Sequence, residues 1–315
     1  MTTARPALYI ASNQIGDCVL ASGVIRELGR ETPGCEITVA CGRHAAPLFR
    51  SAPGVTRIII LDKKTAGGHW LDLWKAAIGT RWGTVVDIRG SAIAWLLRAD
   101  RRRVYSRKFE TGGPKVETIS AMMRAGRTLE PELFLDAAAH ADAAAILGDD
   151  AGRIIALAPI ASVEDRSWPA DRWGALVETL KAEPRFAGWR FMLVGGPGDR
   201  EAAASALKAA GPDAVDFVGK GDIQAAAAAI ARATLFVGND SGLMHIAAAA
   251  GTPTLGLFGP SEWWLKAPWG PKGRIITAGE TQDQPLSIQR LGVDRVVQAV
   301  LALHHDFIGP DAVVP

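Results

Sequence analysis

The chain has 315 residues, of which 48% are hydrophobic and 22% charged, a balance typical of a soluble globular protein with one large or two ordinary domains. Its formal net charge of +2 gives no overall indication of nucleic-acid binding. Its three cysteines show no CxxC or Cys/His ligand spacing, which argues against a disulfide framework or zinc site and favours reduced thiols in the cytoplasm. No apolar stretch is long enough to cross a bilayer, and the first residues lack a signal-peptide core.

The first half of the chain alternates predicted strands and helices. We expect strands at residues 8–12, 36–40, 57–61 and 85–88, and helices at 17–30 and 43–51. The strands are apolar without alternation and are separated by helices. This pattern is typical of parallel sheets covered on both faces.

The pattern restarts after the polar, Gly-rich sequence GDDAG at residues 148–152, which we interpret as a linker. We expect strands at 154–158, 190–194, 214–218, 235–237 and 254–258, and helices at 170–182 and 222–232, near Ser241, and at 294–304. The sequence therefore predicts two α/β domains, residues 1–150 and residues 151–315, the second with a C-terminal helix.

The segment FVGNDSGLMHIAAAAGTPTLGLFGP, residues 236–260, places polar residues inside an apolar run. We expect a strand to end before Asp240 and a helix to begin near Ser241, with Asp240 as its N-cap. The backbone N–H groups of Ser241, Gly242 and Leu243 would then suit a phosphate or diphosphate. His245 lies four residues after Ser241, on the same helix face. The alternative is that Asp240 is only a cap and His245 an ordinary core histidine.

Two further polar residues follow predicted strands. Asp17, in YIASNQIGDCVLASGVIREL, lies at the mouth of the first strand, where it could act as a general base or be only an N-cap. Arg166, in ASVEDRSWPADRW, lies in a loop before a helix and could hold a phosphate with two hydrogen bonds, although loop arginines are more often only solvated.

The remaining features allow two interpretations each. Residues 96–108, LLRADRRRVYSRK, form either a solvated face with a helix C-terminus or a site for an anionic acceptor or membrane surface. Trp70, Trp74, Trp82 and Trp95 could line a sugar site, but such aromatic residues more often belong to a core. The chain has no GxGxxG, Walker A, GxSxG, HExxH or DxD motif, which disfavours an oxidoreductase and metal-dependent transfer.

These segments resemble the bacterial heptosyltransferases of lipopolysaccharide core synthesis, glycosyltransferase family 9. The strongest match is GNDSGLMHIAAAAGTPTLGLFGP, which is similar to the family's nucleotide-binding signature. NQIGDCVLASGVIREL, DRSWPADRW and LVGGPGDRE resemble its Gly-Asp turn, its Lys/Arg-x-Trp-Pro segment and its Gly-Gly-Pro loop. The matches occur in order and span nearly the whole chain.

The resemblance implies an α/β fold of GT-B architecture, with two Rossmann-like domains whose parallel sheets face each other across a cleft. The first domain would bind the acceptor and the second the sugar nucleotide, in an inverting transfer without metal or cofactor. Asp17 would be the catalytic base, and Arg166, where many relatives have lysine, would contact the donor diphosphate. The nucleotide and diphosphate would be held by Asp240, Ser241, Gly242, Leu243 and His245, while Asp216 is a looser match to an acidic residue that contacts the ribose.

By the same resemblance the donor is ADP-heptose, although another nucleotide sugar stays open. The acceptor would be a lipid-linked anionic glycan of lipopolysaccharide or a related surface glycan, met by a cytoplasmic protein at the inner face of the inner membrane. No nucleic-acid partner is expected. Two alternatives remain at this stage: a sugar-nucleotide epimerase of the same fold, and a non-catalytic nucleotide-binding protein.

Overall fold

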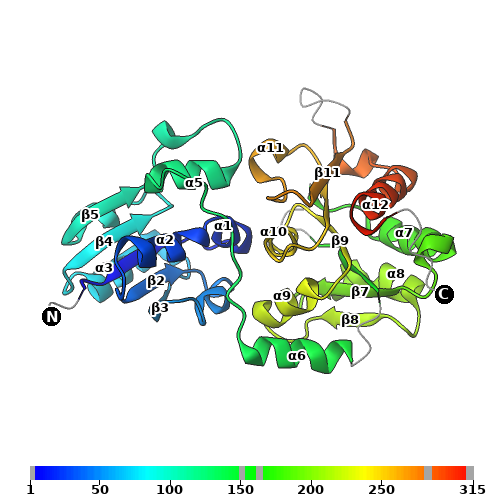
Figure 1. Cartoon of the computed structure of the whole chain (residues 1–315), viewed down its shortest axis with the longest axis horizontal. Helices are drawn as coiled ribbons and strands as arrows, with labels where there is room; N and C mark the ends of the chain where they lie inside the picture. The colour runs from blue at the N-terminus through cyan, green and yellow to red at the C-terminus, as the bar shows by residue number, and fades with distance from the viewer. Residues whose placement is uncertain (1–3, 149–152, 161–165, 280–285, 310–315) are drawn as a thin grey trace. The chain divides into compact units, whose positions relative to one another are not determined.

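A computed structural model describes residues 4–148, 153–160, 166–279 and 286–309. The chain divides into two compact units, Met1–Asp136 and Ala137–Pro315. In each unit a parallel sheet is covered by helices (Figure 1). None of the helices within these ranges is both long and apolar enough to cross a membrane.

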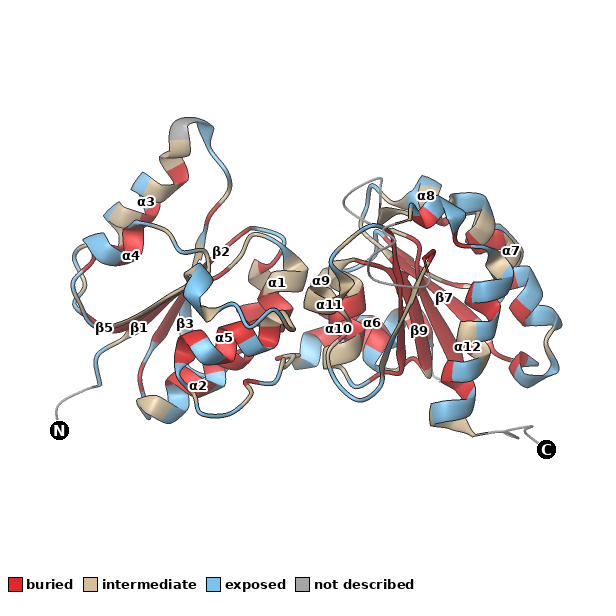
Figure 2. Cartoon of the chain, turned by 90° about the horizontal axis from the view of Figure 1, so that it is seen from above, coloured by how far each residue is buried: buried red, intermediate tan, exposed pale blue. Residues whose placement is uncertain are grey.

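The first unit contains five strands and five α-helices among its described residues. In chain order they are β1 (Ala7–Ile10), α1 (Ile15–Leu20), α2 (Gly23–Glu31), β2 (Ile37–Cys41), β3 (Val55–Ile60), α3 (Gly68–Ala77), β4 (Trp82–Asp87), α4 (Ile93–Leu96), β5 (Ala99–Val104) and α5 (Lys115–Met123). The strands are arranged in the order β3-β2-β1-β4-β5. Helices α3 and α4 lie on one face of the sheet and α2 and α5 on the other (Figure 2).

The central strands confirm the expected apolar pattern, because every residue of β1 and β2 is buried. The predicted helix over residues 17–30 is instead two helices, which break at Ala21 and Ser22. A Cβ on Gly23 would lie 2.6 Å from the carbonyl oxygen of Glu130, so the start of α2 packs closely against the backbone of that residue. The helix expected around residues 43–51 is only a short 3₁₀ turn, Ala46–Phe49, which contains Pro47.

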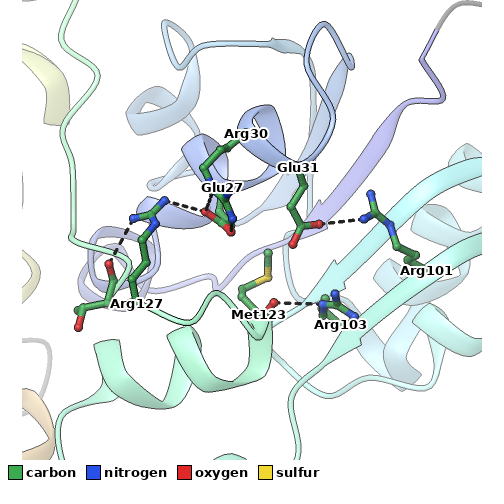
Figure 3. Close-up of polar contacts among 8 residues, drawn as sticks. Glu27, Arg30, Glu31, Arg101, Arg103, Met123 and Arg127 are labelled. Carbon is green, nitrogen blue, oxygen red and sulfur yellow. Dashed lines mark hydrogen bonds and ion pairs between the residues drawn. The ribbon is translucent and has the colours of Figure 1, made fainter.

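A fully buried carboxylate, Glu27 on α2, connects this helix to the segment after α5 (Figure 3). Arg30 donates to both carboxylate oxygens, at 2.6 and 2.9 Å, and Arg127 donates to Oε2 at 2.7 Å. The hydrogen bond from Arg30 is the main reason that the pKa of Glu27 is lowered, and Arg127 adds to it against the effect of burial. Glu27 is therefore a satisfied structural charge.

The second unit is built on six strands within its described part. Its elements are α6 (Ala137–Leu147), β6 (Ile154–Ala158), α7 (Ala170–Ala182), β7 (Arg190–Gly195), α8 (Arg200–Ala210), β8 (Val215–Val218), α9 (Ile223–Ala231), β9 (Leu235–Asn239), α10 (Gly242–Ala249), β10 (Thr254–Phe258), α11 (Trp263–Lys266), β11 (Gly273–Thr277) and α12 (Val293–Ile308). The strand order is β11-β10-β9-β6-β7-β8. Helices α7, α8 and α12 cover one face, and α6, α9 and α10 lie on the other (Figure 2).

The division after Asp136 differs from the boundary expected at residue 150 by one helix. Helix α6 packs against α9 of the second unit, so it belongs with that unit although it precedes the predicted linker. Four residues of the predicted linker, 149–152, lie outside the described residues.

Two glycine-to-alanine substitutions should have opposite effects on stability. Gly256 lies on β10 beneath α10, and an added Cβ would lie 2.5 Å from Sδ of Met244 and 2.7 Å from Cε2 of Phe258, both buried. Gly29 lies inside α2 with nothing within 4 Å of an added Cβ. We expect Gly256→Ala to lower the free energy of unfolding by about 1–3 kcal/mol, and Gly29→Ala to raise it by about 0.5–1 kcal/mol. Denaturant unfolding of both variants measures this, and a Gly256→Ala protein as stable as the parent would contradict the packing of α10.

Replacement of Glu27 by Gln should destabilise the protein in a pH-dependent way. The folded-state pKa of Glu27 lies below its ordinary value of 4.5, so its contribution is fully present above that pH and is lost as pH falls from 4.5 through the folded-state pKa. We expect Glu27→Gln to cost about 2 kcal/mol at neutral pH and less at pH values near and below 4. Thermal unfolding at both pH values tests this, with exposed Glu36→Gln as control. A difference that does not change with pH would count against the ion pairs.

Candidate functional site

Each sheet has one point at which the strand order reverses. In the first unit this point lies between β1 and β4, and in the second between β6 and β9. In parallel α/β sheets, ligands bind beyond the carboxyl ends of the strands at such a point. The residues that follow these four strands are therefore the first place to look for a site.

In the second unit this position holds Arg166, after β6, and Asp240, directly after β9. Nη1 of Arg166 lies 3.4 Å from Oδ2 of Asp240, and the Asp240 side chain is almost completely buried. The structure thus brings together two residues that the sequence analysis selected from separate motifs. Residues 161–165 of the same motif lie outside the described residues.

Two buried polar atoms next to this ion pair have hydrogen-bonding capacity that no described residue uses. They are Nδ2 of Asn239 and Oγ of Ser241. Oδ1 of Asn239, in contrast, accepts from the backbone N–H of Trp168 at 3.2 Å, which ties the end of β9 to the loop that carries Arg166. A buried polar group without a partner is costly, so both atoms are suited to contact a ligand.

Helix α10 begins at Gly242, and its N-cap is Ser241 rather than Asp240 as expected. Asp240 directly follows β9, and its N–H donates to the backbone oxygen of Leu257. The N-terminus of α10, where Gly242 and Leu243 lie, carries the positive partial charge that favours an anion. His245 is buried on the same helix. Helix α10 stops at Ala249, and Gly251 two residues later has a left-handed φ of 77°.

Asp216 is not brought to this cluster. It lies on the edge strand β8, three strands from β9, which corresponds to roughly 14 Å across the sheet. Its carboxylate accepts from Arg200 at 2.7 Å and lies 3.6 Å from Lys220. Burial raises the pKa of Asp216, but the bonds from Arg200 and the Val218 N–H and the charge of Lys220 give a net lowering. The proposed ribose contact stays a prediction.

The first unit places Asp17 in the first turn of α1, just beyond β1. Its Oδ1 lies 2.6 Å from Nζ of Lys115, the first residue of α5, and its Oδ2 accepts from Oγ of Ser12 at 3.0 Å. The carboxylate is therefore held in one orientation by two partners. Sequence reasoning did not select Lys115, since 98 residues separate it from Asp17.

A second cation lies at the same edge of the first sheet. Nη1 of Arg89 donates to Oδ1 of Asn13 at 3.2 Å, and its guanidinium lies 4.4 Å from the ring centroid of Trp70. Burial lowers the pKa of Arg89, partly offset by the charge of Asp87. Arg89 was also not predicted, although its position after the apolar strand β4 is the same signal that selected Asp17.

Several arginines of the basic segment lie on strand β5 and make structural contacts, and a role of the segment toward an acceptor or a membrane stays a prediction. Arg103 donates to the backbone oxygen of Met123 at the end of α5, and Arg101 lies 3.3 Å from Glu31 (Figure 3). Arg102 donates to the backbone oxygen of Ala94, in α4. These contacts do not extend to Arg98, whose side chain is exposed.

The four tryptophans behave differently from one another. Trp82 belongs to the buried core of the first unit, and Trp70 and Trp74 pack against that core. Trp95 is 65% exposed.

All three cysteines are buried free thiols, and burial raises the pKa of each. Within the described ranges, no group of three His, Cys, Asp or Glu side chains is placed to hold a metal ion.

The chain is similar to proteins of known family. The family model for glycosyltransferase family 9 (heptosyltransferase) matches residues 108–290. The chain is 23% identical to lipopolysaccharide heptosyltransferase 3 of Escherichia coli, over 87% of this chain and 89% of that protein. It is 26% identical to lipooligosaccharide heptosyltransferase 2 of Haemophilus influenzae, over 85% and 87%. The solved structure of E. coli ADP-heptose lipopolysaccharide heptosyltransferase II matches with a TM-score of 0.75 at 21% identity, over 95% of this chain and 98% of that chain.

The two Rossmann-like units and their parallel sheets define a GT-B fold, as predicted. The chain belongs to glycosyltransferase family 9, the heptosyltransferase family, and is a glycosyltransferase.

Removal of the Arg166 guanidinium should weaken the binding of a nucleoside diphosphate. We expect Arg166→Ala to reduce affinity roughly 10- to 100-fold, because a charged hydrogen bond to phosphate is lost. Calorimetric titration with ADP, UDP and GDP measures this. Arg185→Ala is the matched control, since Arg185 is exposed and precedes β7 at the opposite end of the strands. Equal affinities of the Arg166→Ala and parent proteins would remove Arg166 from the site.

Proposed function

We propose that this glycosyltransferase moves heptose from ADP-heptose to a lipid-linked, anionic glycan of the lipopolysaccharide core type, with inversion and without a metal ion. The names of the relatives support the sugar and the acceptor class, and the name of the E. coli heptosyltransferase II, which includes ADP-heptose, supports the ADP-linked donor. We place the reaction in the cytoplasm, at the inner face of the inner membrane, where such an acceptor would be reached.

One observation carries the proposal: each unit has an ion-paired polar cluster where its strand order reverses, and each cluster offers a different group to a substrate. The first unit has a carboxylate, Asp17, held by Ser12 and Lys115. The second has a cation, Arg166, together with the N-terminus of α10. A carboxylate suits the acceptor, whose hydroxyl must lose a proton, and a cation suits the donor, whose diphosphate leaves with negative charge.

Asp17 acts as the general base in this proposal. Each carboxylate oxygen can accept more than one hydrogen bond, so the contacts to Ser12 and Lys115 leave capacity for a substrate hydroxyl. As the acceptor oxygen bonds to the anomeric carbon of the donor sugar, its proton passes to Asp17 and the bond from that carbon to the diphosphate oxygen breaks. A single displacement of this kind inverts the configuration at the anomeric carbon.

The second unit stabilises the leaving diphosphate. Arg166, which lies 3.4 Å from the buried carboxylate of Asp240, contributes a cationic hydrogen-bond donor, and the N–H groups at the start of α10 contribute the positive end of the helix dipole. Oγ of Ser241 and Nδ2 of Asn239 add buried groups able to donate hydrogen bonds. These groups would supply the charge neutralisation that a metal ion supplies in other transferases.

Cations near Asp17 favour an anionic acceptor. Lys115 and Arg89 both lie at the carboxyl edge of the first sheet. Arg89 stacks on Trp70, which holds the guanidinium in place, and within the described part of the chain no carboxylate forms an ion pair with it. A phosphorylated or carboxylated glycan would complement these two charges.

Replacement of Asp17 by Asn should abolish proton acceptance and leave donor binding intact. We expect the transfer rate to fall about 10²- to 10⁴-fold, while the affinity for ADP changes little. The assay measures heptose transfer from ADP-heptose to a delipidated core acceptor, with and without a chelator, and Asp62→Asn is the control because Asp62 is an exposed carboxylate of the same unit.

The same assay separates the alternatives. Formation of an epimerised donor without acceptor would favour an epimerase, and nucleotide binding with full activity in Asp17→Asn would remove Asp17 as the base. Loss of transfer on chelation would overturn metal independence.

A further inference from the structure

The first unit carries an exposed apolar tip. Among the residues that the structure describes, the large hydrophobic side chains with high exposure are Ile60, Leu71, Trp95 and Leu96. Ile60 lies apart on the edge strand β3, and the other three, on α3 and α4, form the tip. Trp95 and Leu96 are adjacent on α4 and are 65% and 59% exposed (Figure 2). Leu71 lies on α3, which contacts α4. Neighbouring exposed apolar side chains of this size mark an interaction surface.

A cationic hollow adjoins this tip. It has a volume of about 560 Å³, and its charged lining consists of Arg81, Arg98, Asp100 and Arg102. Leu97, the residue directly after α4, also lines it. The guanidinium carbon of Arg102 lies 6.0 Å from the ring centroid of Trp95, so the cationic wall and the apolar tip are continuous.

The positive charge of this hollow is only partly compensated. Asp100 is shared between Arg5 and Arg81. Arg102 donates to three backbone oxygens, of Ala94, Leu97 and Ala99, which orient its guanidinium without neutralising it. Within the described part of the chain, Arg98 forms no ion pair. Three lining arginines against one carboxylate leave an excess of two positive charges in this hollow.

We propose that α4 and the arginine-lined hollow beside it dock onto a bilayer surface that contains anionic phospholipid. Trp95 and Leu96 enter the interface between headgroups and acyl chains, and Arg98 and Arg102 face the lipid phosphates. Tryptophan favours this interfacial depth, and each basic side chain near an anionic membrane adds attraction.

The combination of positive charge and apolar side chains on this surface favours an anionic bilayer over other binding partners. A soluble polyanion would use the arginines but leave Trp95 and Leu96 in water. An apolar protein partner would cover those two side chains but gain nothing from the uncompensated cations. The inference rests on the proposed function in one respect: a lipid-linked acceptor gives the enzyme a reason to bind at a bilayer.

The test is cosedimentation of the full-length protein with vesicles of phosphatidylcholine alone and vesicles that also contain phosphatidylglycerol. We expect binding to the anionic vesicles, weakened by added salt. Arg98→Ser should weaken it about fivefold, and Trp95→Ser combined with Leu96→Ser about tenfold. Two controls should bind as the parent does: Ile60→Ser, on the opposite edge strand β3, and Lys208→Ser, on α8 of the second unit.

Equal binding to both kinds of vesicle, or equal losses in the controls and the test variants, would overturn the proposal. Transfer to a delipidated acceptor is measured in parallel. Vesicle binding without transfer would overturn the proposed function alone, and transfer without vesicle binding would overturn the docking surface alone. Arg98 is exposed, so we expect Arg98→Ser to fold normally. This variant therefore tests the docking surface even if the combined Trp95→Ser and Leu96→Ser variant fails to fold.

Discussion

The reversal of strand order in each parallel sheet is the constraint on which the site depends. From β1 the chain passes by right-handed crossovers to β2 and β3 on one side, and it then returns to place β4 on the other side of β1. In the second unit it passes from β6 to β7 and β8, and then returns to place β9 on the other side of β6. The loops that follow adjacent strands therefore leave toward opposite faces of the sheet, and the carboxyl edge between them stays open. Arg166 and Asp240 meet there because β6 and β9 are neighbours, although they are far apart in sequence.

The buried polar groups of the two units have different roles, one structural and one suited to ligand binding. Glu27 in the first unit is fully buried, and both of its oxygens accept from arginines. Such a group stabilises one arrangement of α2 and the segment after α5, and has little capacity left for a ligand. Asn239 and Ser241 are buried at the end of a strand and the start of a helix, and part of their capacity is not used by described residues. That difference distinguishes a structural polar group from a binding group without reference to its sequence motif.

Much of the fold and of the second unit's site could be predicted from the sequence, because the signals there are local. Apolar strands β6, β9 and β10 appear as continuous runs, and Asp240 to His245 lie in one segment. β5 was not predicted, because its arginines replace the apolar residues that mark a buried strand. The close packing of Gly23, at the start of α2, against residues 129–130 and the partnership of Asp17 with Lys115 both depend on tertiary folding. Neither leaves a signal in the local sequence.

The arginines of β5 have a further consequence because this strand is the last in its sheet. An edge strand presents unpaired backbone groups that can recruit a strand from another molecule. Successive side chains alternate between the two faces, so Arg101 and Arg103 project to the side opposite Arg102. Charge on both faces of this edge opposes the close approach of a second β5, which carries the same charges. The residues that interrupt the hydrophobic pattern of β5 therefore also protect the enzyme against edge-to-edge aggregation.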